Sequence, residues 1–349
     1  MDFELLPERR GYKANLHCHT TDSDGHLAPE QMKEEYKKRG YSILGYTDHA
    51  YMRDRSALSD ENFVAISGYE HHVELPRKNG KSQRSFHWNF YSPRPDKVGM
   101  IGITDYTWTY YNQIYMKNVG RPERPVDKTP ESPIIGGFYD HGFTVDGSNA
   151  ILEQANREGY LVVLNHPSWC RNDWRDLAGL KGLCGLEIYN SDCILGGYPD
   201  DGEHYYDLML RDGQRIGCFA GDDNHSDPKA YAKFGEENCG FGGYNYIYAD
   251  KLNYDSVFTA MKNGNMYASS GAEIRGVYLK DGRVHVGCEP AACIRIVTDY
   301  RADAVRMREK PLTEAIFELK STDDWFRIVV ENERGKKAYT RGYFLDDYK

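Results

Sequence analysis

Residues 12–26, Tyr-Lys-Ala-Asn-Leu-His-Cys-His-Thr-Thr-Asp-Ser-Asp-Gly-His, are the stretch on which the fold prediction for this 349-residue chain depends. An apolar-leaning run, which we expect to form a strand, ends at His17 and His19, and Asp24 follows in a turn that contains glycine. Alternate side chains of a strand point to the same side, so the two imidazoles can reach one metal ion. An isolated pair of this kind is more often two ordinary half-buried histidines, and the remainder of the chain decides between the two interpretations.

Histidines and carboxylates recur where later apolar runs end. With the first three residues they make nine candidate metal ligands: His17, His19, Asp24, His49, Glu70, His87, His166, Asp223 and His225. One zinc or iron ion takes about four to six ligands, so this number predicts two or three divalent ions that share ligands. Glu70 and the aspartates are the expected bridges because a carboxylate has two oxygen atoms.

Apolar runs typical of strands alternate with segments typical of helices over most of the chain. We expect strands at 12–19, 41–47, 63–69, 85–91, 160–165, 182–189, 215–220 and 244–249, and helices at 27–40, 148–159, 201–212 and 254–263. This alternation predicts an α/β fold built from right-handed β-α-β units, and seven or eight units favour a TIM-like barrel. In barrels the chemistry lies at the carboxyl ends of the strands, where nearly every candidate ligand falls.

Two regions depart from this rhythm. Residues 92–147 are rich in proline, glycine and tyrosine, and we expect an insertion beside the site, because so long a loop is uncommon unless it forms a lid or a binding loop. From residue 272, short runs with period-two alternation predict a small antiparallel β-sandwich. The predicted domains are therefore a barrel over residues 1–271 and a β-sandwich over residues 272–349.

The amino-acid composition limits which partners the protein is expected to bind and in which cellular compartment it is expected to lie. The chain has 44 Lys and Arg against 53 Asp and Glu, and a net charge of −9 argues against non-specific binding to nucleic acid. No apolar run reaches membrane-spanning length, and the N-terminal residues do not have the pattern of a signal peptide. The eight cysteines contain no Cys-x-x-Cys pair, which favours reduced thiols. We therefore expect a cytoplasmic protein that acts on a small molecule.

Taken together, the motifs resemble those of the PHP (polymerase and histidinol phosphatase) superfamily of metal-dependent phosphoesterases. Within it the chain is similar to the CehA/McbA-like branch, which joins the barrel to a C-terminal β-domain. The resemblance covers roughly residues 12–270. It is carried by His17-Cys18-His19 with Asp24-Gly25, Thr47-Asp48-His49, Glu70, His87, His166-Pro167 and Asp223-Asn224-His225.

The resemblance implies a distorted barrel of seven β/α units and a trinuclear site of Mn, Fe or Zn, within the two or three ions that the ligand count predicts. It implies three ligand sets: His17, His19, Glu70 and Asp223; Glu70, His87 and His166; and Asp24, His49 and His225. Some relatives carry histidine at the position of Asp24, and an oxygen ligand there lowers the nitrogen count of the third site. Glu70, Asp223 and His225 are the residues expected to support the metal-bound hydroxide.

Three functions are open from the sequence. The leading hypothesis is hydrolysis of a small anionic phosphate ester by a metal-bridging hydroxide, with Arg171 and Arg175 as candidate phosphate-binding residues. The second is a carbamate, amide or ester hydrolase of the CehA/McbA type, and an apolar pocket lined by Trp108, Tyr110 and Tyr111 would favour such a neutral substrate. The third is a non-catalytic metal-binding scaffold. The oligomeric state is not predicted.

Other polar residues are given lesser roles. His141 in the insertion is a candidate proton donor, and Asp48 and Asp222 could orient neighbouring ligands or face outward. Glu187 is expected on a strand with its side chain directed into the barrel, without a role as a ligand. The remaining histidines are expected at the surface or in turns: His26, His71, His72, His204 and His285.

Overall fold

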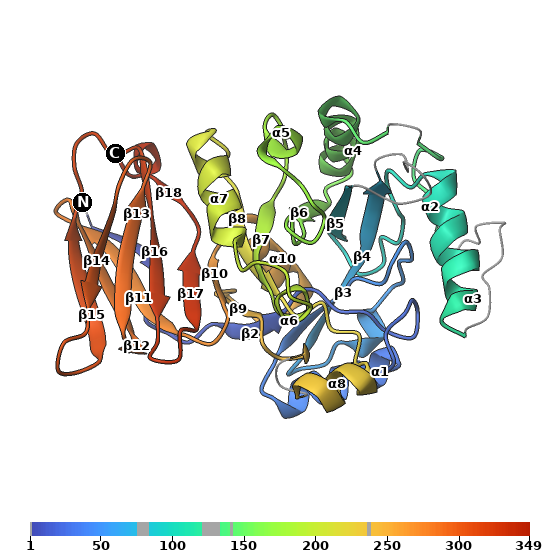
Figure 1. The fold of residues 1–349 in the computed structure, drawn as a ribbon, viewed down its shortest axis with the longest axis horizontal. Coiled ribbons are helices and arrows are strands. Elements are labelled where there is room, and N and C mark those ends of the chain that lie inside the picture. The colour runs from blue at the N-terminus through green and yellow to red at the C-terminus, as the bar shows by residue number, and fades with distance from the viewer. Residues whose placement is uncertain (1, 75–83, 121–132, 140–141, 236–238) are drawn as a thin grey trace.

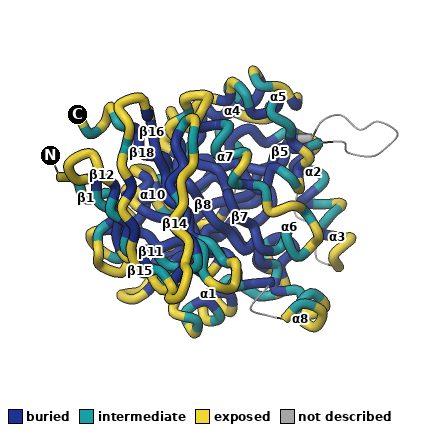
Figure 2. Tube along the Cα trace, turned by 60° about the vertical axis from the view of Figure 1, so that its left-hand side comes forward, coloured by how far each residue is buried: buried dark blue, intermediate teal, exposed yellow. Residues whose placement is uncertain are grey.

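The computed structural model describes residues 2–74, 84–120, 133–139, 142–235 and 239–349 (Figure 1). The fold is mixed α/β, with one large sheet of 14 strands and a second sheet of four. Figure 1 shows the C-terminal strands at one end of the molecule, beside both chain termini, and the α/β part at the other end. Figure 2 shows buried strands beneath an exposed outer layer.

Seven strands of the large sheet lie around the candidate ligands. In sheet order they are β2 (Tyr12–Asn15), β3 (Ile43–Tyr46), β4 (Val64–Glu74), β5 (Ser85–Tyr91), β6 (Leu161–Leu164), β7 (Gly185–Asn190) and β8 (Gly217–Gly221). Their residues are mostly buried on both faces, which explains why the sequence shows continuous apolar runs rather than alternation.

The closed parallel barrel is not confirmed. Strand β5 runs antiparallel to β4 and β6, whereas the pairs β2/β3, β3/β4, β6/β7 and β7/β8 are parallel. No ladder joins β8 to β2 among the described residues, and a single parallel bridge pairs Cys18 with Asn224 beyond the ends of these strands. The seven-strand part of the sheet therefore curves until the segments that follow β2 and β8 approach each other at the edge that carries the candidate ligands, without forming a closed barrel.

Amphipathic helices cover the strands. The longer ones are α1 (Pro29–Lys38), α4 (Val145–Arg157), α7 (Gly202–Arg211) and α10 (Tyr254–Lys262), with α5 (Trp174–Leu177), α6 (Ser191–Leu195), α8 (Pro228–Phe234) and η1 (Ser56–Leu58) between them. The helix expected to start at Ser148 begins earlier, because Thr144 accepts a hydrogen bond from Gly147 N and caps the first turn.

The predicted insertion contains helical structure in its described part. Helix α2 (Asp105–Thr109) continues into a π-helical turn, η2 (Tyr110–Tyr115), and then into α3 (Met116–Asn118). Trp108 and Tyr111 are buried by this arrangement. Residues 121–132 and 140–141, including His141, lie outside the described residues.

The C-terminal strands form two antiparallel layers. One layer is β1 (Phe3–Leu6), β11 (Ile274–Lys280), β12 (Arg283–Ala291) and β15 (Leu312–Glu318). The other contains β14 (Ala302–Arg306), β13 (Cys293–Thr298), β16 (Trp325–Glu331), β17 (Lys337–Thr340) and β18 (Tyr343–Phe344), followed by η3 (Leu345–Tyr348). This second layer continues through β10 (Met266–Ser269) and β9 (Tyr244–Ile247) into β2, so that the large sheet is shared with the α/β part. The N-terminal strand β1, which the sequence did not predict, pairs with β11.

Candidate metal centre

The nine predicted ligands reach one edge of the large sheet. His17 and His19 follow β2, His49 follows β3, and His166 follows β6. Asp223 and His225 follow β8, whereas Asp24 comes from the turn before α1.

Glu70 and His87 reach this edge differently, because both lie within strands. Strand β4 continues four residues beyond Glu70, and His87 near the start of the reversed strand β5 pairs with His72. The reversal of β5 brings His87 to the same edge. The 17-residue spacing between Glu70 and His87 consists of the rest of β4, residues 75–84 and the first residues of β5.

One group of ligand atoms surrounds a position between β2, β4 and β8. His17 Nε2 lies 3.4 Å from Glu70 Oε1 and 3.3 Å from Asp223 Oδ1. His19 Nε2 lies 3.4 Å from Glu70 Oε2 and 3.0 Å from Asp223 Oδ1. All four residues are buried, and one ligand atom from each lies within 4.8 Å of the others.

A second group gathers around Asp24. His225 Nε2 is 3.1 Å and His49 Nε2 is 3.8 Å from Asp24 Oδ2, and the rings of His19 and His225 stack at 4.2 Å. In this group too, one ligand atom from each residue lies within 4.8 Å of the others: His19, Asp24, His49 and His225. His49 Nδ1 lies 3.1 Å from Glu70 Oε2, so Glu70 lies between the two groups.

The third predicted set meets at the other oxygen of Glu70. His87 Nδ1 lies 3.0 Å and His166 Nε2 lies 3.3 Å from Glu70 Oε1. The structure adds a thiol that the sequence interpretation missed, because Cys170 lies within 4.8 Å of both histidines and its Sγ is 3.5 Å from His166 Nδ1. A cysteine four residues after a histidine, in a turn, gives no recognisable signal in a single sequence.

Unsatisfied atoms show that the residues fit bound cations. Five buried atoms of the cluster have no hydrogen-bond partner among the described residues: His17 Nε2, His19 Nε2, His49 Nδ1, His87 Nε2 and Asp223 Oδ1. Each such atom costs about 1–3 kcal/mol when buried, so it needs an explanation. Ligand atoms bound at 2.0–2.1 Å in a tetrahedral site are about 3.3 Å apart. The distances of 3.0–3.4 Å in the first group agree with atoms that share an ion.

Charge states in the cluster suit metal binding. Burial alone would raise the pKa of Glu70, but the surrounding histidines, His87 foremost, hold it well below its ordinary value. Burial lowers the pKa of His49 to about 4 and that of His87 to about 3. Ionised carboxylates and neutral imidazoles are the forms that bind metal.

Three histidines differ from this pattern. Asp24 overcomes the effect of burial and raises the pKa of His225 to about 10. Neighbouring acidic groups likewise overcome burial and raise the pKa of His17 and of His166, so metal binding at these residues must displace protons.

Backbone strain is concentrated at the same edge. Positive φ angles occur at His166 (24°) and Asp223 (54°), and also at Ala50 (44°) and Ser226 (52°), which directly follow ligands. These angles are uncommon for residues other than glycine and cost roughly 1–3 kcal/mol each. The surrounding hydrogen bonds therefore hold the ligands in place against a local preference.

Neighbouring polar residues support the ligand loops. Asp48 accepts hydrogen bonds from Thr20 N and Ser23 Oγ and pairs with Arg55, so it holds the turn that carries Asp24 rather than a ligand ring. Asp222 accepts from Tyr36 Oη and Gly243 N instead of contacting a ligand side chain.

The insertion covers the cluster from outside. The ring of Tyr111 stacks on His49 at 4.6 Å, and Tyr115 Oη donates to Asp24 Oδ2 at 3.1 Å. Tyr111 Oη is also 2.6 Å from His72 Nδ1. The expected insertion beside the site is thus in direct contact with candidate ligands.

Some predictions about individual side chains were wrong. His71 and His72 are buried rather than at the surface, because β4 continues past Glu70 with both faces covered, whereas His26 and His204 are exposed as expected. The Arg175 side chain is 87% exposed and pairs with Asp173. It therefore does not reach the cluster.

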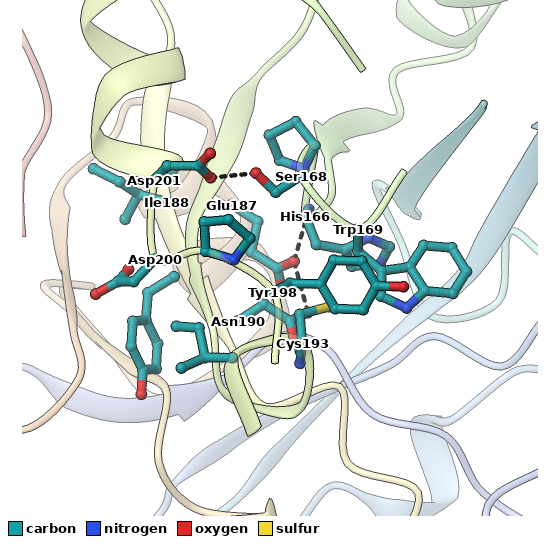
Figure 3. A pocket seen from close by; sticks show the side chains of 15 residues that line it. His166, Ser168, Trp169, Glu187, Ile188, Asn190, Cys193, Tyr198, Asp200 and Asp201 are labelled. Atoms are coloured by element: carbon teal, nitrogen blue, oxygen red, sulfur yellow. Dashed lines mark hydrogen bonds between the residues drawn. The ribbon is translucent and has the colours of Figure 1, made fainter. Parts of the chain in front are cut away.

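A pocket opens beside His166 (Figure 3). Its walls include the rings of Trp169, Tyr189 and Tyr198, and the Arg171 guanidinium lies over Tyr198, 5.5 Å from the ring centre. The described lining contains carboxylates but no lysine or arginine. Trp108, which the sequence analysis placed in a possible apolar pocket, is buried in the core instead.

Comparisons with known proteins give structural neighbours only. No family model and no curated protein matches the chain. A two-domain protein from Bacteroides vulgatus that contains a predicted PHP-like metal-dependent phosphoesterase is 14% identical, with a TM-score of 0.43, over 97% of this chain and 96% of its own. A candidate metal-dependent phosphoesterase from Bifidobacterium adolescentis is 17% identical, with a TM-score of 0.39, over 62% of this chain and 89% of its own. An amidohydrolase from Chromobacterium violaceum with bound sulfate and no metal is 15% identical, with a TM-score of 0.38, over 61% of this chain and 87% of its own.

Two further findings bear on the sequence predictions. Within the described ranges, no helix has both the length and the apolar character needed to cross a membrane. The eight cysteines are all free thiols.

Proposed function

We propose that this protein is a metal-dependent hydrolase, and that its substrate is a small phosphate ester. The observation that carries the proposal is the convergence of nine side chains from separate segments, with five buried nitrogen and oxygen atoms that lack hydrogen-bond partners in the described structure. Divalent Mn, Fe or Zn ions bound there would supply Lewis-acid chemistry and water activated near neutral pH.

Glu70 is the proposed bridging ligand. Its Oε1 faces His17, His87 and His166, and its Oε2 faces His19 and His49. One carboxylate therefore contacts all three ligand sets. Asp223 contributes in the same way, because Oδ1 faces His17 and His19 and Oδ2 faces His166.

His225 is the proposed catalytic residue nearest to solvent. Its side chain is 27% exposed, whereas those of His17 and His19 are almost fully buried. Its Nδ1 donates to the carbonyl oxygen of Asp223 at 2.7 Å, which leaves Nε2 directed to Asp24. Substrate and product are therefore expected to pass on the His225 side, where Tyr115 contacts Asp24.

A second candidate function is hydrolysis of a carbamate, amide or carboxylic ester. The pocket beside His166 favours it, since aromatic rings and carboxylates line the described wall and Arg171 stands only at its rim. Such a wall suits a neutral organic group better than a second anionic group.

The test is turnover by the purified protein after loading with Mn, Fe or Zn. A panel of phosphomonoesters and cyclic phosphodiesters is assayed for phosphate or alcohol release, beside a panel of aryl carbamates and carboxylic esters. Metal-dependent turnover of phosphate esters supports the first function, and turnover of carbamates or esters alone supports the second. No metal-dependent turnover of either panel would count against both.

A further inference from the structure

Glu187 occupies the centre of a hydrogen-bond network behind the candidate metal centre. It lies on β7, is 3% exposed, and lines the pocket beside His166. Its Oε1 is 2.9 Å from His17 Nδ1. Its Oε2 accepts from His166 N at 3.1 Å and from Asn190 Nδ2 at 2.9 Å (Figure 3). A buried carboxylate in this position is an acceptor for three groups at once.

The network reaches three of the proposed ligands. Glu187 contacts the ring of His17 and the backbone N–H of His166. The positive φ of His166, 24°, is a strained conformation that this hydrogen bond helps to hold. Asp223 is reached through Asn190, whose Nδ2 is 3.3 Å from Asp223 Oδ2. Asn190 is itself fixed, because its Oδ1 accepts from Cys193 N and caps α6.

Hydrogen-bond accounting determines which nitrogen of His17 carries a proton. The backbone N–H of His166 and the amide Nδ2 of Asn190 can only donate, and an ionised carboxylate can only accept. No lysine or arginine in the described ranges pairs with Glu187. His17 Nδ1 must therefore donate its proton to Glu187, which leaves Nε2 as the atom directed to Glu70 and Asp223.

Gly221 gives independent support for this placement. A Cβ added at Gly221 would lie 2.2 Å from Glu187 Oε1 and 2.8 Å from the Cβ of His17. Contacts this short cannot be accommodated without displacing the Glu187–His17 pair. The absence of a side chain at the end of β8 is what allows the carboxylate to reach the imidazole.

We propose that Glu187 is the positioning residue of the metal centre: it fixes the tautomer and orientation of His17 and, through His166 and Asn190, the placement of two further ligands. This inference rests on the proposed function, because it assigns a role towards ions bound by these ligands. Carboxylates that hold metal-binding histidines make the coordinating nitrogen more basic, and their loss typically lowers metal affinity 10- to 100-fold.

The decisive variant is Glu187→Gln, which preserves volume. A glutamine offers one acceptor and one donor, so it cannot serve all three donors. Zinc affinity is measured by competition with a chelating dye at fixed pH, and zinc content by elemental analysis. We expect a 10- to 100-fold lower affinity for at least one ion, with cooperative unfolding retained.

The matched control is Asp207→Asn, which removes a carboxylate from the buried pair with Arg327, away from the ligands. This variant is expected to be less stable than wild type and to bind zinc with unchanged affinity. It therefore separates a loss of stability from a loss of ligand orientation.

A second readout needs no variant at position 187. Long-range proton–nitrogen spectra of zinc-loaded protein with labelled histidines report which ring nitrogen carries a proton, and His17→Gln identifies the His17 signals. We expect a proton on Nδ1 of His17. A proton on Nε2, or wild-type zinc affinity in Glu187→Gln, would overturn the inference while leaving the proposed function intact. Failure of the wild-type protein to bind zinc, manganese or iron would instead overturn the proposed function.

Discussion

Two clusters of charged side chains differ in how the negative charge of their carboxylates is compensated. In one, Arg327 of β16 is fully buried and forms two hydrogen bonds with Asp207 of α7, at 2.6 and 2.9 Å, while Arg295 binds both oxygens of Glu203 at 3.0 Å. Two cations face two carboxylates, and the cluster links the C-terminal strands to helix α7.

The candidate metal centre is unbalanced by comparison. Its carboxylates face histidines, and no described lysine or arginine pairs with Asp24, Glu70 or Asp223. Buried carboxylates need compensation. The first cluster is therefore compensated by arginines of the chain itself, whereas the carboxylates of the second are paired with histidines, which are residues that can bind divalent cations from solution.

The largest effect is expected from Glu70→Gln. This substitution removes the charge and one of the two anionic oxygens that face all three ligand sets. We expect metal affinity to fall by more than about 100-fold, beyond the loss typical of residues that only orient ligands, and metal-dependent hydrolysis to fall to background. Dye competition and turnover measure the two effects. Wild-type affinity in this variant would show that Glu70 is not a ligand.

The next largest effect, a loss of stability, is expected from Arg327→Leu. Removal of the guanidinium leaves the Asp207 carboxylate, whose side chain is 18% exposed, without its partner, and we expect a cost of at most about 3–5 kcal/mol. Denaturant unfolding should show this loss. Metal content per folded chain should stay at the wild-type value, and a parallel loss of metal would mean that the two clusters are not independent.

A smaller effect, dependent on pH, is expected at His71. This residue lies on the face of β4 opposite Glu70, packed against Trp88 and Phe90, and burial lowers its pKa to about 3. Below about pH 6.5 the His71 imidazole binds a proton in the unfolded chain but stays neutral in the folded chain. The free energy of unfolding therefore decreases as the pH falls from about 6.5 towards the pKa of His71 in the folded state.

His71→Phe removes this penalty. In metal-free protein, the stability of the variant relative to wild type should increase by about 1 kcal/mol for each pH unit below 6.5. Denaturant titrations at pH 6.5 and 5.5 measure it. A difference that does not change with pH would show that His71 is not held neutral by burial.

The smallest effect is expected from Tyr115→Phe, which removes the hydrogen bond to Asp24 and leaves the ring in place. A single hydrogen bond to a charged group contributes about 1.5–3 kcal/mol at most, and partial exposure reduces this. We expect metal content to be unchanged and turnover to fall about tenfold. Loss of metal would instead make the tyrosine part of the binding site.

Sequence reasoning succeeded where local pattern and chemistry coincide. The proposed ligands His17 and His166 stand at the ends of apolar runs, and the alternation of strands with helices predicts that the carboxyl ends of such runs meet at one edge. It failed where the answer depends on pairing between distant segments. The apolar run of β5 looks the same in either direction, so its reversal and the open sheet could not be foreseen.

Buried polar residues inside strands were equally hard to interpret. Glu187 and His71 stand in apolar runs, and the sequence does not say whether such a residue meets a partner or solvent. Only the fold places Glu187 against His17 and His71 against aromatic rings. The assignment of the nine residues as ligands, and the domain boundary at residue 271, stay predictions that experiment has to test.

Metal content per chain tests the central claim most directly. Wild-type protein is incubated with zinc or manganese, freed of unbound metal, and measured by elemental analysis together with native mass spectrometry. The structure leads us to expect two or three divalent ions per chain, all bound by the folded protein and released by acid. A folded chain that retains no divalent ion under these conditions would contradict the account.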